Sequence, residues 1–407
     1  MTSLIGVRAI CLVLGMACLF PINGADSNAI GARRSLVGET VFDVMKFGAV
    51  ADGRKDNSMA LIRAWNAACR SAIPAKLLIP RGNFVAGEVV FKGPCAKPIV
   101  IEIQGNLLAS DDLSLYSGGA WLMIDEVIGV DVTGGGTING RGQSFWQYGK
   151  GSKNGPSLPV SLVFQSVQYG TMHGLNFVNS MGFHTKVTDS SNVAFWNLKI
   201  TAPGKSPNTD GLHISSSTNV NITDSIIGTG DDCVSVGHGN NNVLVARVFC
   251  GPGHGLSVGS LGKRPDETNL NKVTIINCTL TGTTNGARIK TYHASPRLIA
   301  TGIYFQDLVM NQVKNPIIID QHYDSKKKRQ QSNVQLRDVH FRNIRGTTIS
   351  AVPINLNCSS TCPCNDVELS NIYLAPFGLV GPLRSTCFSA KFFAKGPVVP
   401  PGPSFCA

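Results

Sequence analysis

The sequence has few charged and few aromatic residues for its length. Charged residues make up 15% and aromatic residues 7% of its 407 residues, whereas apolar residues reach 43%. This composition excludes a disordered chain and provides enough apolar material for a large core. No segment alternates basic and aromatic side chains as base-stacking surfaces do, so we expect no nucleic-acid partner.

The mature part of the chain also lacks an apolar run long enough to cross a membrane. Near the N-terminus, Arg8 precedes an apolar stretch at residues 9–20, and small residues follow it up to Ala25. This pattern is typical of a secretory signal peptide, because a spanning helix needs roughly 20 apolar residues. We therefore expect a secreted protein that has no membrane association once the signal is removed. The predicted segments are a signal peptide at 1–25, an N-terminal segment at 26–40 and a single domain at 41–407.

Zinc-ligand patterns are missing as well, although the chain has 12 cysteines. Removal of the signal peptide leaves ten, and an even set in an exported protein indicates disulfides. Cys358, Cys362 and Cys364 are close enough together to suggest a metal site, but no second cysteine or histidine pair completes one. We expect no metal and no organic cofactor. Three Asn-X-Ser/Thr sequons are consistent with surface glycosylation, and they start at Asn221, Asn277 and Asn357.

Acidic residues are fewer than basic ones. Lys and Arg total 36 against 25 Asp and Glu, for a formal net charge of +11. A basic secreted protein attracts anionic partners at long range. The charge predicts that the partner is a polyanion, such as an acidic polysaccharide, but does not identify which polyanion it is.

Helical periodicity is absent from most of the chain, and short β-branched segments recur instead. Each segment alternates apolar and polar residues with a period of two, and Asn, Gly, Ser or Thr residues interrupt the series. Starts recur every 23 to 30 residues or so up to Val273, which is typical of a solenoid. The clearest segments are residues 193–200, 220–227, 243–249, 273–280 and 334–341.

We interpret these repeats as an all-β, single-domain parallel β-helix, with Asn and Gly at corners that need positive φ. A β-sandwich is the alternative, but it would require hairpin turns at shorter spacing. Residues 57–69 are the exception, because their apolar residues share one helical face. Asp56 or Asn57 could cap this helix. It would cover the open edge of the first coil, which is otherwise prone to aggregation.

Four polar motifs then follow one another at coil-length spacing. Asp210 and Asp231 are 21 residues apart, Asp232 and His254 are 22 apart, and Arg288 follows His254 by 34. In a β-helix this spacing stacks the motifs on neighbouring coils, which lie about 4.8 Å apart. Each motif alone would be an ordinary turn or loop. Together they predict one cluster on one sheet face.

The residue types in this cluster suit acid and base chemistry on an anionic sugar. Asp231 and Asp232 can reach one cleft only if the strand ends or bends there, as Gly230 would allow. Like charges disfavour joint ionisation, so one carboxyl can stay protonated as an acid while another acts as a base. Arg288 and Lys290 lie two residues apart on a strand and face the same side, where they could bind a carboxylate.

In this order, the motifs resemble those of the polygalacturonase family of glycoside hydrolases. The similarity extends over nearly the whole mature chain, from Phe42–Gly53 through Gly136–Gly142 to the four motifs. Two further segments, Thr201–Gly211 and Cys250–Gly262, are similar to the plant pollen exopolygalacturonases. The resemblance implies a right-handed parallel β-helix and inverting hydrolysis of α-1,4-galacturonosyl links in the cell wall, with galacturonate released from the non-reducing end.

The resemblance also implies a role for each site residue. Asp231 would be the general acid, and Asp210 with Asp232 would activate the attacking water. His254 would support the protonation of the acid and bind sugar, and Asn208 would help to hold the site. Substrate binding would involve Arg288, Lys290 and Tyr323. The implied disulfides are Cys233–Cys250, Cys358–Cys364 and Cys387–Cys406, with Cys69, Cys95, Cys278 and Cys362 left open.

Three alternatives remain at this point. An endo-acting enzyme would use the same catalytic residues. A pectate lyase would share the β-helix but would need calcium ligands and a basic residue that abstracts a proton. A non-catalytic pectin-binding protein would not need the intact set of three aspartates. The aspartates favour hydrolysis, and we expect a monomer that acts on polygalacturonate.

Overall fold

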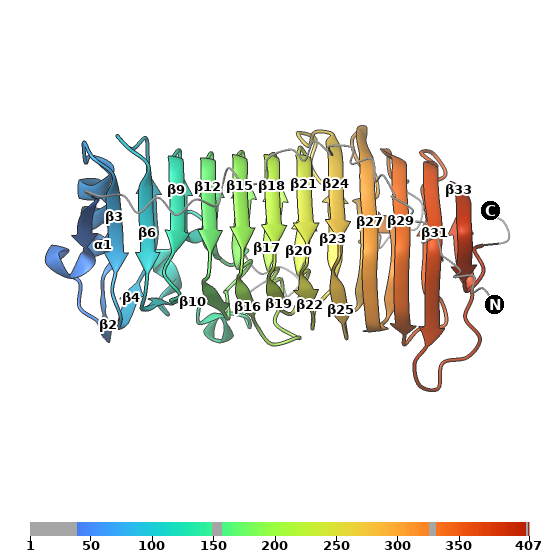
Figure 1. Cartoon of the computed structure of the whole chain (residues 1–407), viewed down its shortest axis with the longest axis horizontal. Helices are drawn as coiled ribbons and strands as arrows, with labels where there is room; N and C mark the ends of the chain where they lie inside the picture. The colour runs from blue at the N-terminus through green and yellow to red at the C-terminus, as the bar shows by residue number, and fades with distance from the viewer. Residues whose placement is uncertain (1–38, 149–156, 325–330, 404–405, 407) are drawn as a thin grey trace, which may run out of the picture. The chain divides into compact units, whose positions relative to one another are not determined.

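Short parallel strands make up nearly all of the protein, stacked coil upon coil (Figure 1). The computed structural model describes residues 39–148, 157–324, 331–403 and 406. The predicted signal peptide lies outside this range. Among the described residues, no helix has the length and apolar character needed to cross a membrane. The unit described below belongs to residues 38–407.

The strands form three parallel ladders, and most coils contribute one strand to each ladder. The first ladder consists of β1 (Thr40–Asp43), β3 (Ala75–Ile79), β6 (Ile99–Ile103), β9 (Ile128–Thr133), β12 (Gln168–His173), β15 (Ser191–Trp196), β18 (Thr218–Thr223), β21 (Asn241–Ala246), β24 (Leu270–Ile276), β27 (Leu298–Val313), β29 (Val334–Thr348), β31 (Cys364–Pro376) and β33 (Ala390–Val399).

The second ladder starts beside the first and merges with it where β27 becomes long enough to pair with both β24 and β25. It consists of β2 (Asp52–Asp56), β4 (Asn83–Ala86), β7 (Asn106–Ala109), β10 (Thr137–Asn139), β13 (Asn176–Val178), β16 (Lys199–Thr201), β19 (Ile226–Gly228), β22 (Phe249–Cys250) and β25 (Thr279–Thr281).

The third ladder is a separate 11-stranded sheet. It consists of β5 (Val89–Lys92), β8 (Ala120–Asp125), β11 (Val160–Gln165), β14 (Thr185–Thr188), β17 (Leu212–Ser215), β20 (Val234–Val236), β23 (Leu256–Leu261), β26 (Asn285–Tyr292), β28 (Asn315–Tyr323), β30 (Ile354–Asn357) and β32 (Ser385–Phe388). The architecture is a right-handed parallel β-helix, the hand that parallel crossovers nearly always take, and the expected fold class is confirmed.

The core is built from the inward half of each alternating segment. Val193, Val220, Val243 and Val273 pair in register on successive coils, and each is at most 2% exposed. Burying an aliphatic side chain of this size contributes roughly 1.5–3 kcal/mol relative to exposure. The period-two pattern therefore stabilises the stack only when coils lie in register.

Asparagines occupy one corner of successive coils, as the pattern predicts. Asn192, Asn219 and Asn242 have φ values of 54°, 56° and 61°. The Asn219 amide donates to the Asn192 side-chain oxygen at 2.9 Å, and the Asn242 amide donates to that of Asn219 at 2.8 Å. Asparagine tolerates left-handed backbone here, and its side chain links each corner to the next.

One helix, α1 (Ser58–Cys69), lies at the N-terminal end of the stack (Figure 1). Its buried residues include all five of the predicted face: Ala60, Leu61, Ala64, Trp65 and Ala68. Asn57 is the cap residue by position, but its side chain accepts from the Val50 amide and donates to the Val85 carbonyl instead. Short 3-10 helices are η1 (Val44–Phe47), η2 (Leu113–Leu115) and η3 (Gly142–Ser144).

Candidate active site

The predicted polar motifs gather on the third ladder, around the N-terminal ends of β17, β20 and β23. Asp210, Asp232 and His254 each lie two residues before the first residue of one of these strands. Those three first residues pair in register. The coil-length spacing therefore places one side chain from each of three neighbouring coils in a row.

Asp231 and Asp232 both lie before β20 begins, so neither is constrained to alternate as residues of a regular strand do. Gly230 permits this path by close approach, because a Cβ atom there would lie 1.9 Å from the Ser206 carbonyl oxygen. The Thr209 hydroxyl accepts a hydrogen bond from the Gly230 amide at 3.1 Å. The segment that leads into Asp231 and Asp232 is therefore closely packed and hydrogen-bonded at Gly230.

The glycines on either side of His254 allow the backbones of neighbouring coils to approach closely. A Cβ atom on Gly253 would lie 2.6 Å from the Asp231 carbonyl oxygen, and one on Gly255 would lie 2.0 Å from that of Asn285. The backbone of Gly255 also has a φ of 94°. The glycines let three coils pack at this position.

Asp232 is the most buried carboxylate of the site, at 1% exposure. Lys290 donates to its Oδ2 at 2.6 Å, and the Ser257 hydroxyl donates to its Oδ1 at 2.7 Å. The Arg288 guanidinium lies 3.8 Å from Oδ1. A buried carboxylate is tolerated when it is paired and hydrogen-bonded in this way.

Asp231 is more accessible and pairs with His254. Its side chain is 23% exposed, and its Oδ1 lies 2.9 Å from His254 Nδ1. The same oxygen accepts from the Asp232 amide at 2.8 Å. Burial opposes ionisation, but the hydrogen bond and charge of His254 outweigh it and lower the pKa of Asp231. The hydrogen bond to Asp231 in turn raises the pKa of His254.

Asp210 behaves differently from the other two carboxylates. It is 5% exposed and accepts a hydrogen bond from the Ser235 hydroxyl at 2.8 Å. Burial, together with the negative charges of Asp231 and Asp232, raises its pKa well above the usual value. Asp210 therefore favours the protonated form and Asp231 favours the ionised form, as expected for carboxyls that share a site.

Replacing Asp210 by Asn should stabilise the protein near neutral pH and abolish its activity. A raised folded-state pKa means that the folded state binds the proton more tightly, so Asp210 destabilises the fold as pH rises through that value. Asn keeps the shape and removes this cost. Thermal melts should give Asp210→Asn a melting temperature a few degrees higher at pH 7 and no gain near pH 3. A gain that does not depend on pH would contradict the argument.

Arg288 and Lys290 lie on β26 and face the same side, as their spacing predicts. Tyr323, at the end of β28, covers both cations: its ring centroid is 5.2 Å from Arg288 Cζ and 5.3 Å from Lys290 Nζ. An aromatic face over two cations holds them in place by cation–π attraction. The structure therefore brings Tyr323 to the same site.

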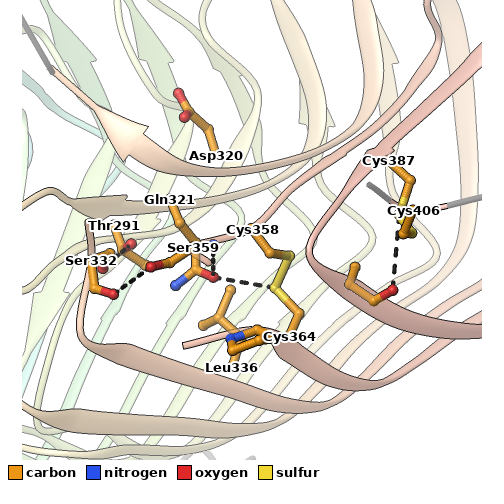
Figure 2. Close-up of a disulfide and its surroundings, with 12 residues drawn as sticks. Thr291, Asp320, Gln321, Ser332, Leu336, Cys358, Ser359, Cys364, Cys387 and Cys406 are labelled. Atoms are coloured by element: carbon orange, nitrogen blue, oxygen red, sulfur yellow. Dashed lines mark hydrogen bonds between the residues drawn. A yellow bond between two sulfur atoms is a disulfide. The ribbon is translucent and has the colours of Figure 1, made fainter. Parts of the chain in front are cut away.

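A buried polar network joins β26 and β28 to residues that lie before β29 and after β30 (Figure 2). The Thr291 and Ser332 hydroxyls lie 2.7 Å apart, and the Ser359 hydroxyl donates to the Ser332 carbonyl at 2.7 Å. Gln321 accepts from the Ser359 amide at 3.1 Å. Figure 2 also shows the disulfide between Cys358 and Cys364 beside Gln321. Because its members are buried and bonded to one another, this network limits the movement of the strands that carry Lys290 and Tyr323.

Asn208 does not join the cluster through hydrogen bonds. It is an exposed loop residue with a φ of 55°, and its side chain has no hydrogen-bond partner among the described residues. The neighbouring Thr209 hydroxyl lies 2.6 Å from the Ser206 hydroxyl and also binds the Gly230 amide. Thr209 therefore helps to hold this segment, and the role of Asn208 stays a prediction.

Three polar residues of the site were missed by the sequence analysis: Ser235, Ser257 and His213. They occupy one row, since His213 pairs with Ser235, Ser235 with Ser257, and Ser257 with Arg288. The sequence does contain a signal for the two serines, because each of them follows a predicted site residue by three positions. In a Val-rich strand, however, a lone serine is an ordinary surface residue.

Eight cysteines form four disulfides in the structure. The three pairs implied by the resemblance are present, and a fourth joins two of the cysteines left open: Cys233–Cys250, Cys358–Cys364, Cys387–Cys406 and Cys69–Cys95. Cys278 and Cys362 are free, and burial raises the pKa of the Cys278 thiol to about 11. Four disulfides indicate an oxidising, extracellular environment.

The three sequon asparagines differ in accessibility. Asn221 and Asn277 are exposed, whereas Asn357 lies half-buried on β30. The residue after Asn357 is the disulfide-bonded Cys358, and the hydroxyl of Ser359 is already engaged. Glycosylation stays a prediction at all three positions, and accessibility favours the first two.

Asp231, Asp232 and His254 also form the kind of group that can hold a metal ion, with ligand atoms within 4.8 Å of one another. The lone pairs of Asp232 are already used by Lys290, Ser257 and the nearby Arg288. Two cations beside the same carboxylate repel a third. The residues present therefore suit an anionic ligand better than a metal.

The comparison with known proteins agrees with this geometry. The model of glycosyl hydrolases family 28 matches residues 69–392. An exopolygalacturonase of Arabidopsis thaliana (clone GBGE184) is 43% identical over 372 residues, covering 90% of this chain and 87% of the relative. The exopolygalacturonase of Zea mays is 37% identical over 397 residues, covering 96% of each chain.

Solved structures show the same fold. The endo-xylogalacturonan hydrolase of Aspergillus tubingensis superposes with a TM-score of 0.76 at 24% identity, covering 88% of this chain and 100% of that one. The Thermotoga maritima exopolygalacturonase gives a TM-score of 0.72 at 18% identity, with coverage of 87% and 90%. The family match spans most of the chain and includes every site residue described above. The chain belongs to glycosyl hydrolases family 28.

Proposed function

We propose that the protein is an extracellular polygalacturonase that hydrolyses polygalacturonate in the cell wall and releases galacturonate from the non-reducing end. The observation that carries this proposal is the pairing of three carboxylates with Arg288 and Lys290 on one sheet face. Carboxylates of unequal pKa provide acid and base, and the two cations provide a site for the sugar carboxylate. The names of the Arabidopsis and Zea relatives support the exo mode.

In this proposal Asp231 is the general acid. It is the most accessible of the three carboxylates and can meet the leaving oxygen. Its pKa is low in the free protein, but a bound sugar carboxylate adds negative charge and displaces water, and both favour the protonated form. His254 holds Asp231 in position through the 2.9 Å contact.

Asp210 and Asp232 hold and activate the water that attacks the anomeric carbon from the opposite face. Asp232 pairs with Lys290 at 2.6 Å and has Arg288 at 3.8 Å, and in this proposal it is the base that accepts a proton from the water. Asp210 orients the water while the Ser235 hydroxyl fixes its own position. Because the attack comes from the face opposite the leaving group, the configuration inverts.

Chromatography of the first products from unesterified polygalacturonate tests the proposal. We expect galacturonate alone from the earliest time point, and an unchanged rate in the presence of EDTA. Mixed oligomers at early times would instead identify an endo-acting enzyme with the same residues. An unsaturated, ultraviolet-absorbing product that requires calcium would identify a lyase and would overturn the hydrolase proposal.

A further inference from the structure

A third cation, Lys186, faces the site from the side opposite Arg288 and Lys290. Lys186 lies on β14 and pairs in register with His213 on β17. The row continues through Ser235 and Ser257 to Arg288 on β26. Lys186 therefore lies two strands before the catalytic coil of β20, and Arg288 lies two strands after it. At about 4.8 Å per strand, each backbone position is roughly 10 Å from that coil.

Lys186 has no anionic partner in the part of the chain that the structure describes. It is half-buried, and no carboxylate among the described residues lies within 4.0 Å of its ammonium group. Burial, together with the positive charge of Arg264, lowers the pKa of Lys186, and the negative charge of Asp189 opposes this only in part. A half-buried ammonium group without a counter-ion is costly, and a ligand carboxylate would relieve that cost.

The surface between Lys186 and the carboxylates suits a sugar ring. The Phe183 and His213 rings lie 5.1 Å apart, and His213 Nδ1 lies 2.8 Å from the Ser235 hydroxyl. Burial and the nearby charge of Lys186 lower the pKa of His213 to about 3, so its ring stays neutral. A neutral imidazole beside an aromatic ring offers a polar and an apolar contact without competing with Lys186 for an anion.

The proposed catalytic roles set the direction of the chain over this surface. Asp210, which orients the water, precedes β17, on the Lys186 side of the catalytic coil. The partner of the acid, His254, precedes β23, on the Arg288 side. Water attacks the anomeric carbon of the terminal unit, which is released as galacturonate. The acid protonates the glycosidic oxygen, which stays with the remaining polymer. The released unit therefore lies towards β14, and the remaining polymer lies towards β26.

We propose that Lys186 binds the carboxylate of the non-reducing terminal galacturonate, while Arg288 and Lys290 bind that of the next unit. This inference rests on the proposed function and deepens it. The two cationic sites flank the scissile bond and require a charged sugar on each side. Lys186 is then a specificity-determining residue for the released unit.

Digalacturonate and its two mono-methyl esters test the inference with Lys186→Gln. On digalacturonate, kcat/KM should fall roughly tenfold to hundredfold, the effect of losing one hydrogen bond to a charged group. On the ester of the non-reducing unit, Lys186→Gln and the wild type should have the same kcat/KM, because the charge that Lys186 binds is missing. On the ester of the reducing unit, Lys186→Gln should again lose as much kcat/KM as it does on digalacturonate. Lys186→Arg should keep most of the activity.

Lys199→Gln is the matched control, because Lys199 is exposed on β16, in a different ladder, and makes no ion pair among the described residues. It should match the wild type on all three substrates. An equal loss for Lys186→Gln on all three would overturn the inference, as would a loss that follows only the charge of the reducing unit.

Calorimetry separates this inference from the proposed function, because it requires no turnover. The wild type should bind two galacturonates per chain, one at Lys186 and one at Arg288 and Lys290, whereas Lys186→Gln should bind only the second. If the wild type hydrolyses polygalacturonate but Lys186→Gln still binds two galacturonates, the role of Lys186 is wrong and the proposed function stands. If Lys186→Gln loses one of the two galacturonates but the wild type hydrolyses no polygalacturonate, the anion site at Lys186 exists without the proposed enzyme activity.

Discussion

Asp231→Asn should lower kcat on polygalacturonate by roughly 10²–10⁴-fold, the usual contribution of a general acid. The Asn side chain has the same shape and can still accept hydrogen bonds from His254 and from the Asp232 amide. It cannot deliver a proton to the leaving oxygen. We therefore expect normal folding, a KM within a fewfold of the wild type, and a loss confined almost entirely to kcat.

The same variant should change the titration of His254. The pKa of His254 is raised by its hydrogen bond to Asp231 and by the charge of that carboxylate. With Asn at 231, histidine NMR signals should show the pKa of His254 falling towards its ordinary value. This readout tests whether Asp231 is the cause of the raised pKa of His254.

Asp224→Asn is the control for Asp231→Asn. Asp224 pairs with Arg247 at an exposed corner of the helix, with contacts of 2.6 and 2.7 Å. Exposed pairs contribute roughly 0–1 kcal/mol, so this variant should keep both its activity and its stability. If Asp231→Asn retained more than a tenth of wild-type turnover, Asp231 would not be the acid.

Lys290→Met should destabilise the fold by roughly 3–5 kcal/mol, the cost of leaving one partner of a buried ion pair alone. Lys290 and Asp232 are 6% and 1% exposed, and their charged atoms lie 2.6 Å apart. Burial opposes the charge on Lys290, but the carboxylate of Asp232 outweighs it and raises the pKa of Lys290. Without Lys290, Asp232 keeps the hydrogen bond from the Ser257 hydroxyl, and its nearest cation is Arg288 at 3.8 Å.

The double variant Asp232→Asn, Lys290→Met distinguishes this cause from simple loss of packing. It removes both charges, so urea unfolding should return most of the stability that Lys290→Met loses. Activity should stay absent, because the base is gone. If both variants were equally unstable, packing of the Lys290 side chain would explain the effect in place of the charge pair.

The cluster could be predicted because the coil length is nearly constant along this part of the chain. Two successive spacings of 22 residues placed Asp210, Asp232 and His254 on consecutive coils. The longer gap to Arg288 contains the connection between β23 and β24, yet Arg288 still lies on the next coil. A rule based on strict spacing would have missed Arg288, whereas the order of motifs identified it.

The parts that could not be predicted depend on contacts between coils. Gly253 and Gly255 are required by backbones of neighbouring coils, and a single sequence does not show how closely these approach. The merging of two ladders at β27 was also missed, since its alternation continues over 16 residues through a former corner. Lys186 resembles any surface lysine until its register with Arg288 is known.

Two of the four disulfides lie at the ends of the stack, where coils open most readily. In a linear array each coil contacts only its neighbours, so the terminal coils have one interface fewer and unfold locally at lower free energy. Cys69–Cys95 ties α1 to the segment after β5 at one end, and Cys387–Cys406 ties β32 to the last described residue at the other. The coils from β14 to β28 lie between these two ties. Fraying of the ends would therefore be restrained before it reached the coils that carry the catalytic residues.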